Sequence, residues 1–145
     1  CVLCPVQHGP MKPTDDGRWC HIACSHFVPE TCAVDVCKQE PITGIEDVDE
    51  KRWRMRCIVC GTSKGACVQC DAPKCFKTFH VGCAVYVRRE LLGGAFYLMA
   101  EEMPKTDEIR HRKYCPYHAF LANVPDSQVA KHLRRRSKGE RHKHR

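Results

Sequence analysis

Long apolar runs and aromatic side chains are scarce in this sequence. Aromatic residues make up 8% of its 145 residues, and the mean hydropathy is −0.47. No apolar run approaches the roughly 18 residues that a membrane-spanning helix needs, and the chain opens on Cys1 with neither an initiator methionine nor a signal peptide. A short chain with so thin a core needs disulfides or metal ions to stabilise a fold. We therefore expect one or two small cross-linked domains, cut from a longer protein.

Motifs of common catalytic sites are also lacking. The sequence contains no evident nucleophile–base arrangement and no glycine-rich phosphate-binding loop. Its many thiols do not replace them, because a thiol that is committed to a metal ion is a poor nucleophile. The sequence therefore favours a binding module over an enzyme.

Cysteine, in contrast, is abundant and is spaced like a metal ligand. The thirteen cysteines are an odd number, and they occur with histidines in Cx2C, Hx2C and Cx2H units. Two residues between ligands let the backbone turn so that both donor atoms face one tetrahedral Zn2+ ion. Both observations favour zinc over disulfides, and they predict a reducing compartment, the cytosol or the nucleus.

The first set of candidate ligands predicts a zinc knuckle at the N-terminus. Its members are Cys1, Cys4, His21 and Cys24. The last two are three residues apart, and such positions lie on one face of a helical turn, so they can chelate together. Cys20, His8 and His26 lie nearby and are alternative ligands. We interpret Trp19 as a lid packed on this small core.

The connector that follows, residues 25–56, contains no further metal spacing. It predicts short extended pieces in SHFVPE and EPITGIEDV, broken by Pro29 and Pro41, and then a solvated helical turn with Trp53 buried. Cys32 and Cys37 lack a partner histidine, so we interpret them as buried or free thiols and regard a metal role as the weaker alternative.

The second half of the chain offers nine candidate ligands for two sites that need eight. These are Cys57, Cys60, Cys67, Cys70, Cys75, His80, Cys83, Cys115 and His118. If Cys67 and Cys70 chelate together, Cys75 is idle, whereas a Cys70 and Cys75 pair leaves Cys67 idle. Spacing alone leaves this choice open.

Between the last two ligand pairs the sequence predicts a helix and a hairpin. Residues 84–92 have helical spacing and stop at Gly93-Gly94. Residues 95–103 alternate like a strand, Pro104 to Asp107 form a turn, and residues 109–115 return toward the last ligands. In the C-terminal tail, Asp126 or Ser127 begins a short helix through Leu133, and the composition beyond Arg136 is typical of disorder.

The net charge of +7 is concentrated in that tail. Residues 131–145 hold eight of the 24 basic and one of the 17 acidic side chains, so residues 1–130 are formally neutral. Three zinc sites with three thiolates each would bring the folded part to about −3. Affinity for polyanions must then come from the tail or from local clusters. The candidate nucleic-acid contacts are Arg52, Arg54, Arg56, Lys74, Lys77, Arg134, Arg135 and Arg136. The alternatives are merely solvated side chains and, for the tail, a nuclear-import signal.

Several stretches resemble one known family. GACVQCDAPKCFKTFHVGCA followed by YCPYH resembles the atypical second finger of the extended PHD module, a zinc knuckle plus a PHD finger. LCPVQHGPMKPTDDGRWCHIACSHFVPE and EPITGIEDVDEKRW resemble its knuckle and connector. The resemblance covers residues 1 to about 120 and is strongest to the Jade and BRPF type scaffolds of histone acetyltransferase complexes. Cys20 departs from the usual small or apolar residue, the ordinary PHD finger that precedes this unit is absent, and the tail has no counterpart.

The resemblance resolves the ligand choice and implies a domain organisation. It implies a cross-brace in which Cys57, Cys60, His80 and Cys83 bind one zinc and Cys70, Cys75, Cys115 and His118 bind another, with Cys67 in the core. The expected fold is small, zinc-stabilised α+β with short hairpins and one helix. We expect a knuckle at 1–24, a connector packed on both zinc units at 25–56, an atypical PHD finger at 57–120 and a largely disordered basic tail at 121–145. All three zinc ions would be structural, with no open position for a catalytic water.

Three functions are weighed. The favoured one, which the resemblance implies, is a non-catalytic chromatin-binding module in the nucleus. It would be monomeric, would contact double-stranded DNA, histone H3 or both in nucleosomes, and would act beside other subunits of a chromatin-modifying complex. The second is a histone H3 tail reader without DNA binding, in which Glu46, Asp47 and Asp49 meet a basic peptide. The third, a RING-type ubiquitin ligase, fits poorly because four residues separate Cys75 from His80.

Overall fold

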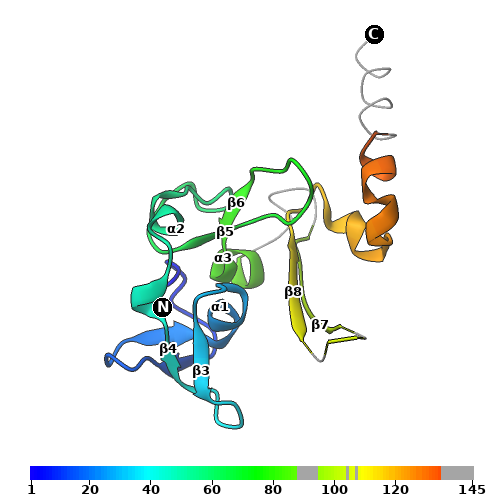
Figure 1. Ribbon diagram of the computed structural model, residues 1–145. Helices are drawn as coiled ribbons and strands as arrows, with labels where there is room; N and C mark the ends of the chain where they lie inside the picture. The colour runs from blue at the N-terminus through cyan, green and yellow to red at the C-terminus, as the bar shows by residue number, and fades with distance from the viewer. Residues whose placement is uncertain (88–94, 104, 107, 135–145) are drawn as a thin grey trace.

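The computed structural model describes residues 1–87, 95–103, 105–106 and 108–134. Within them, four antiparallel hairpins and several short helices surround three groups of cysteine and histidine side chains (Figure 1). The hairpins pair β1 (Met11–Pro13) with β2 (Trp19–His21), β3 (Cys32–Asp35) with β4 (Glu40–Thr43), β5 (Cys67–Gln69) with β6 (Thr78–His80), and β7 (Tyr97–Glu102) with β8 (Ile109–Tyr114). The predicted small α+β class is therefore confirmed.

One strand-to-helix unit occurs twice. Its two helices are α1 (Ile22–Phe27), which follows β2, and α3 (Val81–Tyr86), which follows β6. In each unit the last strand residue, His21 or His80, is the helix N-cap, and a cysteine, Cys24 or Cys83, stands three residues later. This spacing places each histidine and cysteine on the same face of the first turn. α1 and α3 contact each other near the centre of the molecule (Figure 1).

The helix α3 is shorter than the helix predicted over residues 84–92. It ends at Tyr86 because Val87 has an extended backbone, with φ −91° and ψ 148°. The ring of Tyr86 lies against that of His21, with 4.8 Å between centroids, which holds the chain where it leaves the helix. The rest of the predicted helix and its Gly93-Gly94 stop lie outside the described residues.

After the β3–β4 hairpin, the connector consists of short helical turns. These are η1 (Ile45–Asp47) and α2 (Glu50–Arg54). The side chain of Asp49 accepts a 2.9 Å hydrogen bond from the Lys51 N–H and caps α2. Trp53 is partly exposed, so the prediction that it is buried is wrong, because α2 lies on the surface and fully buries none of its side chains. The extended conformation predicted from Ser25 to Phe27 is also wrong, because these residues belong to α1.

The predicted hairpin forms as β7–β8, although burial does not alternate from residue to residue along β7. On its inner face Arg112 is buried, and its guanidinium donates to the Glu101 carboxylate at 3.2 Å and to the Tyr114 hydroxyl at 2.9 Å. A buried charge is stable only when it is paired in this way. Beyond β8 come η3 (Ala119–Asn123), η4 (Asp126–Gln128) and a helical segment over 129–134 (orange in Figure 1). This matches the predicted short helix, although no side chain caps it.

A continuous core joins the two halves of the chain. Leu3, Ile42, Phe79 and Leu121 are each at most 1% exposed although they come from four different regions. The N–H of Ala66 donates to the carbonyl of Leu3 at 2.9 Å, which ties the N-terminal segment to the start of β5. The predicted knuckle and finger therefore pack on each other directly. Within the described residues, no helix has the length and apolarity to cross a membrane.

The first hairpin and the connector correct further predictions about single side chains. Trp19 is 57% exposed and is not a lid, because alternation along β2 turns Cys20 (0% exposed) inward and Trp19 outward. Cys32 and Cys37 are exposed free thiols, so the free-thiol alternative is confirmed and burial is not. Neither joins a metal cluster in the described part of the chain.

Candidate metal centres

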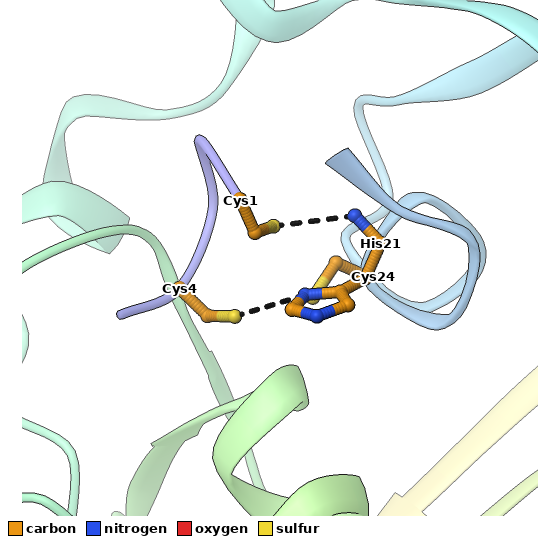
Figure 2. Close-up of side chains that lie close together, drawn as sticks. All are labelled: Cys1, Cys4, His21 and Cys24. Atoms are coloured by element: carbon orange, nitrogen blue, oxygen red, sulfur yellow. Dashed lines mark hydrogen bonds between the residues drawn. The ribbon is translucent and has the colours of Figure 1, made fainter. Parts of the chain in front are cut away.

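The first cluster joins Cys1, Cys4, His21 and Cys24, which converge from the N-terminal turn and from the start of α1 (Figure 2). Nδ1 of His21 lies 3.2 Å from the Cys4 sulfur and 3.7 Å from the Cys24 sulfur. On the other side of the ring, Nε2 lies 2.6 Å from the carbonyl oxygen of His8. A proton donated from Nε2 to that carbonyl leaves the Nδ1 lone pair facing the sulfurs, which is the usual second shell of a metal-binding histidine.

The second cluster has the same set of donors, Cys57, Cys60, His80 and Cys83, but Nε2 of His80 has no hydrogen-bond partner in the described part of the chain. Nδ1 of His80 lies 3.4 Å from the Cys60 sulfur and 3.7 Å from the Cys83 sulfur. The ring is fully buried. The repeated strand-to-helix unit thus presents the same two donors to both clusters.

The third cluster joins Cys70, Cys75, Cys115 and His118, which are spread over 49 residues. Nδ1 of His118 lies 3.3 Å from the Cys115 sulfur and 3.9 Å from the Cys70 sulfur, and the Cys75 and Cys115 sulfurs are 3.9 Å apart. Cys70 follows β5, and Cys115 follows β8, so this cluster joins two hairpins.

The donor sets fit tetrahedral zinc. Zn–S bonds of about 2.3 Å and Zn–N bonds of about 2.0–2.1 Å place the sulfur and nitrogen corners of a tetrahedron roughly 3.6 Å apart. The sulfur–Nδ1 distances of 3.2–3.9 Å bracket that value. In each cluster the four donor atoms lie within 4.8 Å of one another. Three thiolates, one imidazole and no fifth donor are typical of a structural site, so the chain has the ligands for three structural zinc ions.

Backbone N–H groups stabilise the thiolate form of one cysteine in each cluster. Cys1 accepts from Leu3 and His21, Cys57 from Val59 and His80, and Cys70 from Cys115, all at 3.3–3.4 Å. Hydrogen bonds from Cys83, from the His80 side chain and from the backbone of Cys60 and His80 hold the pKa of Cys57 at about 3 despite its burial. The same pairing raises the pKa of Cys83, because the donating thiol keeps its proton. Zn2+ supplies the charge that lets both ionise.

Two cysteines are packed in the core beside the clusters. The thiol of Cys67 donates to the Met55 carbonyl at 3.3 Å, and burial raises its pKa to about 12. Burial likewise raises the pKa of Cys20 to about 12, and its thiol donates to the His21 carbonyl at 3.3 Å. The structure therefore groups Cys75 with Cys70 and leaves Cys67 out, as the family resemblance implied.

The second and third clusters are interleaved along the chain. Cys70 and Cys75 lie between the two halves of the second cluster, and His80 and Cys83 lie between the two halves of the third. Each cluster therefore closes only when the other segment folds across it. This is the cross-brace that the resemblance predicted.

The glycine of α3 connects the second cluster to the first. A Cβ placed on Gly82 would lie 2.2 Å from the Cys4 sulfur and 3.5 Å from Nδ1 of His21. Only a residue without a side chain lets α3 approach the first cluster this closely. Gly82 was not singled out in the sequence, where nothing distinguishes it from a helix-weakening glycine.

The predicted nucleic-acid contacts fall into different environments. Arg52 donates to Glu30 at 2.8 Å with only about a fifth of either side chain exposed, and the exposed Arg54 pairs with Glu50 at 3.3 Å. Lys74 and Lys77 are exposed on the loop of residues 70–77 between β5 and β6, hereafter the β5–β6 loop. The remaining described candidates, Arg56 and Arg134, are exposed, and Arg135 and Arg136 lie outside the described residues.

The comparisons with known proteins agree with this geometry. The model of the PHD-zinc-finger-like domain family matches residues 1–117. Protein Jade-1 of Xenopus laevis is 34% identical over 132 residues, which cover 90% of this chain and 15% of that protein. Histone-lysine N-methyltransferase ATX2 of Arabidopsis thaliana is 52% identical over 84 residues, which cover 58% of this chain and 8% of that protein.

A solved structure has the same fold. The zebrafish PHF14-PZP crystal structure matches with a TM-score of 0.59 and 34% identity, covering 82% of this chain and 62% of that one. The resemblance to the extended PHD module is thus confirmed. This chain spans only 8–15% of the length of the two curated relatives, so their names describe much larger proteins. The family match over residues 1–117, with three Cys3His clusters built from residues 1–118, shows that the chain belongs to the PHD-zinc-finger-like domain family.

Proposed function

We propose that this chain is a non-catalytic, nuclear, chromatin-binding module that contacts nucleosomes through double-stranded DNA, with histone H3 as a second ligand. The observation that carries the proposal is the exposed pair Lys74 and Lys77 on the β5–β6 loop. No described carboxylate lies within ion-pair distance of either lysine. Several other basic side chains, including Arg52, Arg110 and Arg112, are instead occupied by Glu30, Asp126 and Glu101.

The metal chemistry supports a binding role. Each of the three clusters offers four protein donors, which leaves no position for a substrate or a catalytic water on zinc. The clusters therefore fix surfaces, and exposed lysines without a carboxylate partner on a fixed surface can contact phosphates. Two Arabidopsis relatives are named histone-lysine methyltransferases, which supports placing the module next to histones as part of a larger chromatin regulator.

The test is a titration of the full 145-residue chain against a labelled 20-base-pair duplex, an unmodified H3 peptide and nucleosomes, by fluorescence anisotropy at several salt concentrations. The variant is Lys74→Glu combined with Lys77→Glu. Because each lost phosphate contact reduces the slope of log K against log salt by about 0.9, we expect the slope to fall by about 2 and the duplex affinity to fall at least tenfold near 0.1 M salt. Charge reversal across Arg134–Arg136 tests the contribution of the tail in the same assay.

The matched control is Lys38→Glu combined with Lys105→Glu. Both lysines are exposed in hairpin turns, and the net charge changes by the same amount as in the test variant. The β3–β4 turn, which carries Lys38, lies at the bottom of Figure 1, away from the β5–β6 loop. Equal losses in both variants would mean that overall charge rather than this loop binds DNA. Binding to the H3 peptide without any duplex binding would replace the proposal by the histone-reader function, and binding to none of the ligands would refute both.

A further inference from the structure

The β5–β6 loop exposes an aromatic ring that folding does not explain. Phe76 is 82% exposed, more than any other large apolar side chain in the described part of the chain. It stands between the two lysines of the loop, Lys74 and Lys77. An exposed phenylalanine adds nothing to core burial, and phosphate binding by the lysines does not need it.

The loop backbone that carries this ring is held in place on both sides. Cys75, the residue before Phe76, belongs to the third zinc cluster. The N–H of Cys70 donates to the Lys77 carbonyl at 3.0 Å, and the Gln69 side chain donates to the Cys75 carbonyl at 2.8 Å. Backbone bonds on both sides and a metal ligand next to the ring mean that little conformational entropy is lost when a partner packs against Phe76.

The surroundings of the ring combine apolar surface with positive charge. Phe76 and Lys74 line an open hollow of about 510 Å3 that also contains Ile58 and Thr78. Next to it, the Lys77 ammonium lies 4.9 Å from the centre of the half-exposed Tyr117 ring. This surface therefore offers the exposed ring of Phe76, two ammonium groups, one of them over the Tyr117 ring, and a hollow beside them.

These features discriminate between kinds of partner. A duplex presents phosphates but keeps its bases stacked, so it uses the lysines and leaves Phe76 unused. A largely apolar protein partner would use Phe76 but would have to desolvate the lysines. Unpaired nucleotides use both, because each base can stack on an aromatic face while its phosphates meet cations.

We propose that the β5–β6 loop binds single-stranded nucleic acid, with an unpaired base stacked on Phe76 and the adjacent phosphates on Lys74 and Lys77. This inference rests on the proposed function in that the same lysines serve both. It adds a preference for unpaired bases, such as those of an opened duplex or of a transcript. Single-stranded DNA and RNA share this chemistry, and the Phe76 contact uses the base face that they have in common.

The experiment measures binding of the full chain to labelled 12-nucleotide dT and rU strands and to the 20-base-pair duplex. Phe76→Ala removes the platform, Phe76→Trp retains it, and Trp19→Ala is the matched control because Trp19 is also an exposed aromatic, on the β1–β2 hairpin. We expect Phe76→Ala to weaken single-strand binding about tenfold or more, given the strength of base–aromatic stacking. Duplex binding should stay within a factor of two, and Phe76→Trp should match the wild type. Zinc content and circular dichroism verify that each variant is folded.

The outcomes separate this inference from the proposed function. If the duplex binds but Phe76→Ala leaves single-strand affinity unchanged, the inference is wrong and the proposed function stands. If single strands bind through Phe76 while duplex, H3 peptide and nucleosomes do not, the inference stands and the proposed function fails. A Phe76→Ala loss seen with the H3 peptide and nucleosomes but with no single strand would assign the ring to a protein partner and overturn the inference. Stronger loss with rU than with dT, or the reverse, identifies which single strand the loop prefers.

Discussion

The contact between α3 and the first zinc cluster predicts that replacing a helical glycine by alanine lowers stability, which is the opposite of the usual effect. In a helix interior, replacing glycine by alanine normally stabilises a protein by about 0.5–1 kcal/mol, because glycine loses more backbone entropy on folding. Gly82 is a helical residue of α3, so propensity alone predicts that Gly82→Ala raises stability. The structure predicts the opposite, since the new methyl carbon would lie 2.2 Å from the Cys4 sulfur and 3.1 Å from its Cβ.

The size of the stability loss depends on which atoms can move to relieve the clash. The Cys4 sulfur is a ligand of the first cluster and cannot turn away without leaving the zinc ion, so either α3 or the cluster must shift by more than 1 Å. Overpacking of this kind typically costs about 1–3 kcal/mol. Because the Cys4 sulfur cannot yield, we take the upper end of this range, and with the favourable helix term subtracted we expect Gly82→Ala to lower the free energy of unfolding by about 2 kcal/mol. For a chain of this size that lowers Tm by roughly 5–8 °C.

The assay combines thermal unfolding with zinc stoichiometry. Gly17→Ala is the matched control, because a Cβ there meets nothing within 4 Å although the backbone is left-handed at φ +83°. It should cost only about 1 kcal/mol from backbone strain and should retain three zinc ions. A Gly82→Ala protein that retains three zinc ions and is as stable as the wild type, or more stable, would refute the close packing of α3 on the first cluster.

Two further predictions concern a core thiol and a partly buried ion pair. Cys67→Ala should keep three zinc ions and lose about 1 kcal/mol of stability, whereas Cys70→Ala should lose zinc from the third cluster. Mass spectrometry under native conditions counts the bound ions. Only two zinc ions on Cys67→Ala would contradict the assignment of Cys67 to the core. Arg52→Ala should lower stability by about 1–2 kcal/mol at pH 7 while leaving DNA affinity unchanged, because Arg52 is engaged by Glu30. Burial raises the pKa of Glu30, but hydrogen bonds from Arg52 and Asp49 outweigh it and lower that pKa overall. The ion pair therefore stabilises the fold above the unfolded pKa of about 4.3 and is lost as the pH falls through the lower folded value, so the mutant should show a flatter acid limb in urea unfolding between about pH 5 and pH 3.

The metal sites were predictable from sequence because zinc restricts spacing. Pairs of donors two residues apart require only a local turn, and this signal identified eleven of the twelve clustered residues without tertiary information. The exception was Cys75, which four residues separate from its partner Cys70, whereas the competing thiol of Cys67 has the two-residue spacing to Cys70. Only the fold distinguishes Cys67 from Cys75, because Cys67 belongs to β5 and its side chain is buried there.

Side-chain exposure was harder to predict for Trp19 and Trp53. Both were assigned to the interior because large aromatics usually contribute most to a small core. Here the zinc clusters and small apolar residues supply much of that interior, so the indoles stay wholly or partly outside. The surroundings of the basic side chains proposed to contact nucleic acid were hard to predict for a related reason. Charge can be counted in a sequence, but whether Arg52 meets Glu30 or solvent depends on how the connector folds.

The interleaved wiring has a consequence for the order in which the metal ions enter. During synthesis the first cluster is complete once Cys24 has emerged, and the second once Cys83 has. The third waits for His118, so Cys70 and Cys75 remain reduced, unprotected thiols while 43 further residues are made. That interval is when the nascent chain is most open to oxidation or to capture of zinc by a wrong set of donors. The β5–β6 loop, which these two cysteines pin in place, is therefore the last surface of the module to mature.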